Sequence, residues 1–214
     1  MAEQLTGILL LSLLVSGTAV ALSSMAGIPL GVWLGLSRFR GKQLVMAAVH
    51  TGMAMPPVVA GLLLYLLLSR RGPLGGLGWL FSPQAMIAAQ TLLALPFVIG
   101  ITQAAVAAVS PDLQWQLRSL GLSPRQLQWE IVREARAGIF FAITAALGRS
   151  LSEVGAIWIV GGNIEGQTRV LTTAIMQETR QGNFPLAVAL GGALLVIALV
   201  INLLILRCRS HQPA

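Results

Sequence analysis

The sequence predicts an all-α polytopic membrane protein with about five transmembrane helices, and two observations carry this prediction. Of its 214 residues, 56% are hydrophobic and only 10% are charged, whereas an ordinary soluble domain carries about 25% charged residues. The apolar residues also form long runs, and at about 20 residues per crossing five or six spans fit with their loops. Soluble enzymes, disordered chains and coiled coils are excluded by the same composition.

The first uncharged run covers residues 4–37 and is longer than one membrane crossing requires. We expect Gly27, Pro29 and Gly31 to bend or interrupt its helix. Residues 19–21 have the Ala-x-Ala form of a signal-peptide cleavage site, but no basic residue precedes them. The segment is therefore expected to be a retained span rather than a cleaved signal.

Three glycines spaced four residues apart, Gly27, Gly31 and Gly35, lie on one face of this first helix. A stripe of this kind lets two helix backbones approach closely. It indicates contact with another span, either in the same chain or in a second copy.

Four further apolar runs give the remaining spans. Pro56 and Pro57 are expected to break the second span, because proline removes a helix hydrogen bond and restricts the residue before it. Pro96 predicts a kink in the third span, and the glycine- and proline-rich segment 70–78 predicts a loop. The four runs cover residues 43–69, 83–109, 138–162 and 184–206.

The basic residues predict the orientation. With five spans and the N-terminus outside, nine Lys and Arg residues fall inside and four fall outside, which follows the positive-inside rule. This topology also accounts for the net charge of +7, so no nucleic-acid partner is expected. The inside set is Arg38, Arg40, Lys42, Arg118, Arg125, Arg133, Arg136, Arg207 and Arg209, and the outside set is Arg70, Arg71, Arg169 and Arg180.

The polar segment 110–136 predicts a short cytoplasmic helix-turn-helix. Ser110 is suited to be an N-cap, Pro111 to be the first helical residue and Asp112 to lie in the first turn. Gly121 can end this helix in a left-handed conformation.

A second helix is predicted to begin at Ser123, which with Gln126 has the spacing of a capping box. The segment is either an amphipathic connector on the membrane surface or a docking element that fits a groove on a soluble partner. Its apolar positions at helical spacing are Leu113, Leu117, Leu120, Leu127 and Ile131.

Arg149 and Glu153 are the charges least expected in an apolar span, because each costs about 2.5–3.5 kcal/mol near the bilayer centre. Their i, i+4 spacing allows them to pair on one helix face. One interpretation is a structural pair that locks two helices together. The other, which we favour as a hypothesis, is a gate or pathway-lining element.

The outer segment 163–183 carries hydroxyl, amide and cationic side chains, which suit transient contact with an anion. The alternative is a re-entrant or interfacial loop that contacts a partner protein. The candidates that we take from this segment are Asn163, Thr168, Arg169 and Thr172.

Motifs for nucleotide or metal chemistry do not occur in the sequence. It has no P-loop and no His-Glu-x-x-His motif, and it contains two histidines. We therefore expect no catalytic residue, no metal site and no cofactor in this chain. Energy for transport must come from a partner or from an ion gradient.

Residues 115–131 resemble the EAA loop of binding-protein-dependent ABC importer permeases. Gly121 and Ile131 match its glycine and its later aliphatic residue, whereas residues 115–117 replace the Glu-Ala-Ala sequence. Three further segments are similar to oxyanion importers of this family. They are residues 55–75, residues 148–156 and residues 160–175, the last of which looks most like the tungstate-type branch.

The resemblance implies a type I importer fold, with residues 1–214 as a single permease domain and 110–136 as its coupling loop. It implies a second copy of the chain, a cytoplasmic subunit that binds ATP and Mg²⁺, and an extracytoplasmic oxyanion-binding protein. It also implies a multi-pass protein of a prokaryotic inner membrane. The residues implied to contact the ATPase subunit are Trp115, Leu117, Leu120, Gly121, Leu122 and Ser123, and the matching motifs add Met55, Pro56 and Gly155 to the gate candidates.

The function that follows is ATP-driven import of tungstate or molybdate. A permease for sulfate or another small solute stays open as an alternative. Two readings of another class also stay open, a membrane scaffold and an ion-coupled secondary carrier.

Overall fold

The computed structural model describes residues 2–210, without the side chains of residues 2–4, 114 and 204–210. The described part is helical throughout, with no β-strand. Its elements are α1 (Ala2–Leu36), α2 (Lys42–Met53), α3 (Pro57–Leu68), the short 3₁₀ helix η1 (Gly75–Leu77), α4 (Pro83–Ala107), α5 (Pro111–Ser119), α6 (Pro124–Glu134), α7 (Arg136–Leu151), α8 (Gly155–Gly161), α9 (Leu171–Arg180) and α10 (Phe184–Ser210).

Up to five segments are long and apolar enough to cross a membrane if each bent helix pair counts as one span, which agrees with the expected number. Three are continuous helices: α1, α4 and α10. The other two are pairs of helices joined by short breaks, with a bend of 97° between α2 and α3 and of 59° between α7 and α8. The first of these breaks falls at the two prolines, as the sequence predicts.

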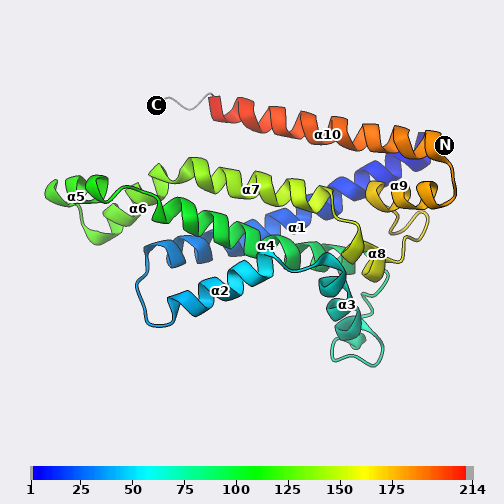
Figure 1. Ribbon diagram of the computed structural model, residues 1–214, viewed down its shortest axis with the longest axis horizontal. Coiled ribbons are helices and arrows are strands. Elements are labelled where there is room, and N and C mark those ends of the chain that lie inside the picture. Colours follow the sequence, from blue (N-terminus) through cyan, green and yellow to red (C-terminus); the bar gives the residue numbers. More distant parts are fainter. Residues whose placement is uncertain (1, 211–214) are drawn as a thin grey trace.

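Helix α4 lies at the centre, and α1 runs beside it (Figure 1). The glycine stripe of α1 makes this contact. A Cβ atom at Gly27 would lie 2.8 Å from Cγ1 of Val98, and one at Gly31 would lie 2.7 Å from Cβ of Thr102. The stripe therefore packs within the chain, which answers the question that the sequence leaves open.

The expected interruption of the first span is wrong, because α1 is one helix from Ala2 to Leu36 with Pro29 inside it. Gly27 and Gly31 pack against α4 on both sides of Pro29. Such packing by a neighbouring helix is what allows proline in a membrane helix. Helix α4 likewise continues through Pro96.

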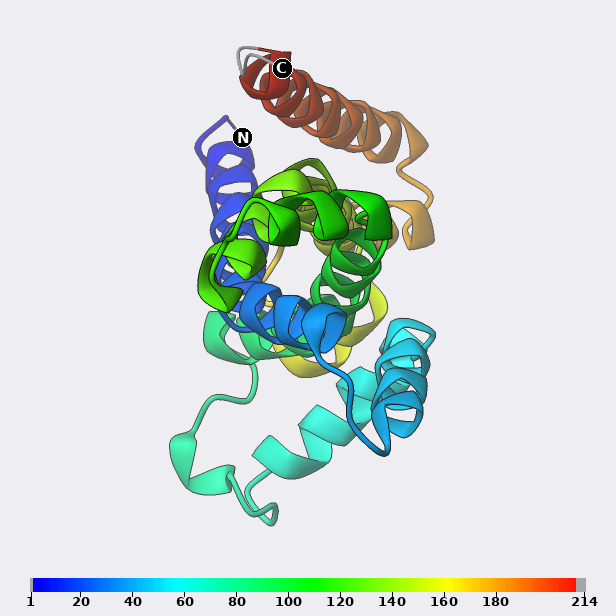
Figure 2. The same cartoon turned by 90° about the vertical axis from the view of Figure 1, so that its left-hand side faces the viewer.

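The two ends of the molecule differ. Helices α5 and α6, the connection from α1 to α2 and the C-terminal end of α10 lie at one end, whereas the N-terminus and α9 lie at the other (Figure 1). Viewed along the long axis, α10 and the α2–α3 pair lie on opposite sides of the central helices (Figure 2). One apolar core cluster joins α1, α3, α4 and α8, and a second lies beneath α5 and α6.

Candidate functional site

Helices α5 and α6 form the expected helix-turn-helix, held by local hydrogen bonds. Ser110 Oγ accepts from the N–H of Leu113 at 3.1 Å. Gly121 makes the turn with a φ of +77°, a conformation that suits glycine. Ser123 then caps α6: its N–H donates to Oε1 of Gln126 at 2.9 Å, and its Oγ accepts from the N–H of Gln126 at 3.4 Å. The predicted capping box is confirmed.

The hairpin has a packed side and an unpacked side. Leu117 contacts the core cluster that contains Leu127 and Ile131. In contrast, Leu120 is 76% exposed, although it follows the same sequence spacing, because α5 ends at Ser119 before it. Leu122 is half-buried. The large apolar side chains left exposed on the hairpin are Trp115, Leu120 and Trp129.

Arg149 and Glu153 do not pair, so the expectation that they lie on one helix face is wrong. Helix α7 ends at Leu151, between the two residues, and the chain then bends. Ion pairs in the described part join Glu130 to Arg133 and Glu165 to Arg169. The i, i+4 spacing brings side chains together only where the helix continues.

Each of the two charges has a different neighbour instead. The guanidinium of Arg149 lies over the ring of Phe97, with Cζ 4.7 Å from the ring centroid, and its buried Nε has no hydrogen-bond partner. Glu153 is 5% exposed, and its Oε1 accepts from the N–H of Ala156 at 2.9 Å. Glu153 thus caps the first turn of α8, where a negative charge is stabilised by free N–H groups.

The two broken spans meet through their short arms, α3 and α8. A Cβ atom at Gly61 would lie 2.8 Å from Cα of Ala156, and one at Gly155 would lie 3.1 Å from Cγ2 of Val58. Met55 packs against the core cluster that joins α3 and α8, and Pro56 is the N-cap of α3. The structure therefore brings together the candidates near Met55 and those near Glu153.

The candidates in the outer segment are engaged within the chain. Thr172 donates from Oγ1 to the carbonyl of Glu153 at 2.8 Å, so it holds the break between α7 and α8. Thr168 is fully buried; its Oγ1 donates to the carbonyl of Gly161 at 2.6 Å and accepts from the N–H of Ile164 at 2.8 Å.

The other two outer candidates lie nearby. Asn163 has a φ of +51° and donates from Nδ2 to Oε1 of Gln177. Arg169 pairs with Glu165, at 3.4 Å between the guanidinium and the carboxylate.

Sequence reasoning missed Gln90 and Ser12. Gln90 is 2% exposed inside α4, and its Nε2 donates to the carbonyl of Ser150 at 2.9 Å, next to Arg149. Ser12 on α1 accepts from the N–H of Leu171, at the start of α9, at 2.9 Å. The available signal was an amide at the middle of an apolar stretch, since polar residues inside a span usually face protein or water.

No metal centre is formed by the described side chains, since no group of three or more His, Cys, Asp or Glu residues is close enough to hold an ion.

The described part thus combines three long apolar helices, two bent helix pairs and a polar helical hairpin at one end. The chain belongs to the family of inner membrane components of binding-protein-dependent transport systems, whose model matches residues 27–208. The family to which the coupling loop pointed is thus confirmed.

Three named transport proteins are similar to this chain over most of their length. A probable anion ABC transporter permease protein of Haloferax volcanii is 45% identical over 98% of this chain and 92% of its own length. The tungstate uptake system permease protein TupB of Peptoclostridium acidaminophilum is 41% identical over 94% of this chain and 89% of its own. The molybdenum transport system permease protein ModB of Escherichia coli is 32% identical over 78% and 76%.

The fold also matches a solved structure, the inward-facing MetNI methionine ABC transporter. The match has a TM-score of 0.78, 20% identity, and covers 100% of this chain and 98% of that one. It confirms the type I importer fold that the sequence resemblance implies.

Proposed function

We propose that this chain is the membrane-spanning subunit of an ATP-driven importer that carries tungstate into the cytoplasm. Two copies form the pathway, a separate ATPase subunit supplies energy, and an extracytoplasmic binding protein delivers the anion. The N-terminus lies outside and the C-terminus inside. ATP and Mg²⁺ bind to the ATPase subunit, and this chain carries no cofactor of its own.

The observation that carries this proposal is the α5–α6 hairpin. Its three exposed apolar side chains, Trp115, Leu120 and Trp129, lie on a rigid, doubly capped element. Aromatic residues exposed on such an element are typical of a protein interface core. Because the chain itself lacks a P-loop, this surface suits the ATPase subunit, with Gly121 and Ser123 fixing the shape of the turn.

The distribution of basic residues supports the proposed orientation. Arg38, Arg40 and Lys42 lie in the connection from α1 to α2 or at its end, at the same end of the molecule as the hairpin (Figure 1). The hairpin and the start of α7 add Arg118, Arg125, Arg133 and Arg136. A concentration of cations on one side marks the cytoplasmic side.

The pathway in this proposal passes the breaks of the two bent spans. Arg149 is a cation inside a span, where its insertion costs about 2.5–3.5 kcal/mol. A desolvated cation–π contact such as that with Phe97 returns about 2 kcal/mol. The part of the insertion cost of Arg149 that the Phe97 contact does not offset favours transient contact between Arg149 and a passing anion.

The other candidates act around Arg149 as a gate. Glu153 and Gly155 set where α8 begins, and Met55 and Pro56 set where α3 begins. Thr168 and Thr172 shape the outer mouth through hydrogen bonds to backbone groups, and Asn163 through its hydrogen bond to Gln177. Arg169 contributes a cation there.

The names of the relatives support tungstate as the substrate, with molybdate as the second candidate. Tungstate uptake permeases of two bacteria are 39% and 41% identical to this chain, whereas the molybdenum permease of Escherichia coli is 32% identical. Sulfate follows, through a cyanobacterial sulfate permease at 27% identity.

The test is uptake measured by elemental analysis. Cells without their own oxyanion importers express the chain with its ATPase and binding protein and receive tungstate, molybdate and sulfate together. We expect tungsten to accumulate, and the Glu153→Gln variant to assemble but to lose uptake. If none of the three elements accumulates while all subunits assemble, the oxyanion substrate is wrong.

A charge on the hairpin separates the importer from the alternatives. Leu120→Glu should abolish both co-purification of the ATPase and uptake. Gln181→Glu adds the same charge directly after α9, at the end of the molecule opposite the hairpin, and should preserve both. A secondary carrier would keep transporting in Leu120→Glu, and a scaffold would bind partners without any uptake.

A further inference from the structure

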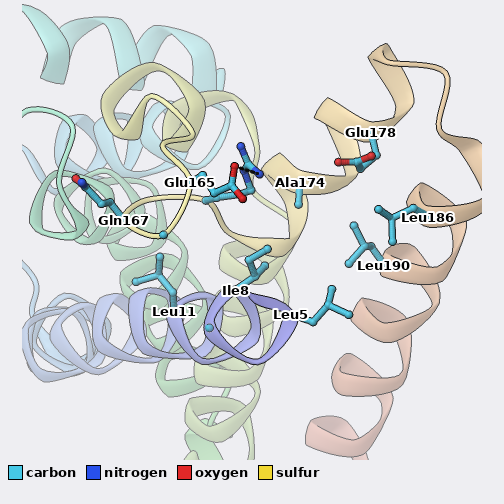
Figure 3. A pocket seen from close by; sticks show the side chains of 12 residues that line it. Leu5, Ile8, Leu11, Glu165, Gln167, Ala174, Glu178, Leu186 and Leu190 are labelled. Carbon is cyan, nitrogen blue, oxygen red and sulfur yellow. Dashed lines mark ion pairs between the residues drawn. The ribbon is translucent and has the colours of Figure 1, made fainter. Parts of the chain in front are cut away.

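A pocket of about 550 Å³ (Figure 3) lies between the start of α1 and α9, which are at the end of the molecule away from the hairpin (Figure 1). It lies between the start of α1, the loop before α9, α9 itself and the start of α10. Its volume falls within the usual range for a small-molecule site. Of the candidates for the gate and pathway, Arg169 is the one that lines it.

One wall of the pocket is apolar. Leu5, Ile8 and Leu11 come from α1, and Leu186 and Leu190 come from α10 (Figure 3). The apolar stretches of these two helices begin at Leu5 and Phe184. The pocket therefore lies at the boundary between the hydrocarbon core and the head-group layer, where an amphipathic molecule is favoured.

The opposite wall is charged. Glu165 pairs with Arg169 at 3.4 Å, and Glu178, whose Oε2 accepts from Nδ2 of Asn183 at 2.8 Å, faces the pocket from α9. The Arg169 side chain is 17% exposed, and its buried Nε has no hydrogen-bond partner.

Two carboxylates and one guanidinium repel a tetrahedral dianion, so the pocket is not a cargo site. They match a head group that carries both an ammonium and a phosphate. An ammonium with its own N–H donors can bind carboxylates, and a guanidinium can bind phosphate.

Helix α10 also lacks packing partners. Its apolar window is 11% buried, compared with 56% for α4, and its contacts are chiefly with α9 and α7. Both helices also carry exposed apolar side chains, such as Leu10 on α1 and Val188 on α10. Acyl chains that leave the pocket would run along these two helices.

We propose that this pocket binds a zwitterionic phospholipid with a primary ammonium, of the phosphatidylethanolamine type. The ammonium lies between Glu165 and Glu178, the phosphate lies at Arg169, and the chains pack between α1 and α10. The lipid thus joins α10 to the rest of the chain. This inference does not depend on which anion is transported.

Native mass spectrometry of the assembled importer tests the proposal. The complex is supplied with equal amounts of dioleoyl phosphatidylethanolamine, phosphatidylcholine and phosphatidylglycerol. We expect the ethanolamine lipid to be retained about tenfold over the choline lipid, as one charged hydrogen bond would give, and the anionic glycerol lipid to be retained least. Equal retention of all three, or none, overturns the proposal.

Two glycines of α1 provide a matched pair of variants. Gly7 lines the pocket, and a Cβ atom there meets no atom within 4 Å, so Gly7→Trp fills the pocket without a clash at its own position. Gly17 is equally open but lies outside the pocket. Gly7→Trp should lose the lipid, and Gly17→Trp should keep it.

Carboxylate variants test the preference for the head group, and the Gly7→Trp variant tests the location of the site. Glu178→Gln should remove the preference for ethanolamine over choline, whereas Glu134→Gln, in the hairpin, should leave it intact. If Gly7→Trp retains as much lipid as the wild type, the pocket is not the site. If Gly7→Trp instead splits the complex into single copies of the chain, the pocket is an interface between copies and the proposal is wrong.

Discussion

Two spans of this protein are broken, but they are broken by different means. The α2–α3 span bends by 97° at Pro56 and Pro57, whereas the α7–α8 span bends by 59° at a break that contains no proline. In the first, the backbone itself cannot continue the helix. In the second, the Glu153 carboxylate binds the N–H of Ala156 and so starts a new helix.

A helix can therefore be broken by the backbone restriction of proline or by a hydrogen bond from a side chain. The break at Pro56 and Pro57 has two adjacent residues that each lack the N–H needed to continue the helix. A break held by a carboxylate depends on its hydrogen bonds, on Thr172 behind it and on the contact of α8 with α3. The α7–α8 break is therefore the one that small changes should alter.

The largest effect is expected where the two broken spans touch. Gly61→Leu places a side chain against the backbone of Ala156, from which a Cβ atom would be 2.8 Å away. Because backbone cannot move aside cheaply, we expect a loss of about 3 kcal/mol in stability, measured as thermal unfolding in detergent. Gly148→Leu, where nothing lies within 4 Å of the added Cβ, is the control. Equal unfolding temperatures for the two variants would show that the arms are not packed as described.

Removal of the carboxylate should have the next largest effect. Glu153→Ala leaves the N–H of Ala156 buried without an acceptor, which costs about 2 kcal/mol. Glu153→Gln keeps an oxygen in that place and should lose less than about half as much. Hydrogen exchange at the start of α8 measures both. A glutamine variant that opens as readily as the alanine variant would mean that the charge, rather than the hydrogen bond, holds the break.

A smaller effect is expected at Thr172. Thr172→Val keeps the shape of the side chain but removes the hydrogen bond to the carbonyl of Glu153, at a cost of about 1 kcal/mol. Thr179→Val on the same helix loses a bond to its own helix at an exposed position and should cost less than about 0.5 kcal/mol. The comparison of their unfolding temperatures fails to support the structure if Thr179→Val is the more damaging change.

The smallest effect is expected at the proline break. Pro57→Ala still leaves Pro56 and the contact of α3 with α8, so the bend should remain and stability should fall by less than about 1 kcal/mol. Thermal unfolding and ATPase co-purification together check this. A larger loss would make Pro57 itself, rather than the packing of α3, the cause of the bend.

The sequence predicts this molecule well where structure follows from local chemistry. The capping box of α6, the turn at Gly121, the break at Pro56 and Pro57 and the number of spans all depend on neighbouring residues, and the structure contains each of them.

The sequence predicts contacts between distant elements less well. The sequence pattern predicts one span over residues 138–162, in which Arg149 and Glu153 would pair on one helix face. Their neighbours are Phe97 on α4 and Thr172 on α9, contacts that no spacing along the chain encodes. Pro29 does not interrupt α1, because α4 packs against α1 on both sides of it.

The contact of α1 with α4 also limits how the protein can move. Gly27, Gly31 and Gly35 face Val98, Thr102 and Val106, and both series repeat every four residues. A small slide would drive larger side chains into this seam, whereas a slide of one whole repeat, about 6 Å, would restore two of the three contacts. The pair therefore behaves as a ratchet with discrete positions, and gradual motion in a transport cycle must be taken up by the bent spans on one side and by α10 on the other.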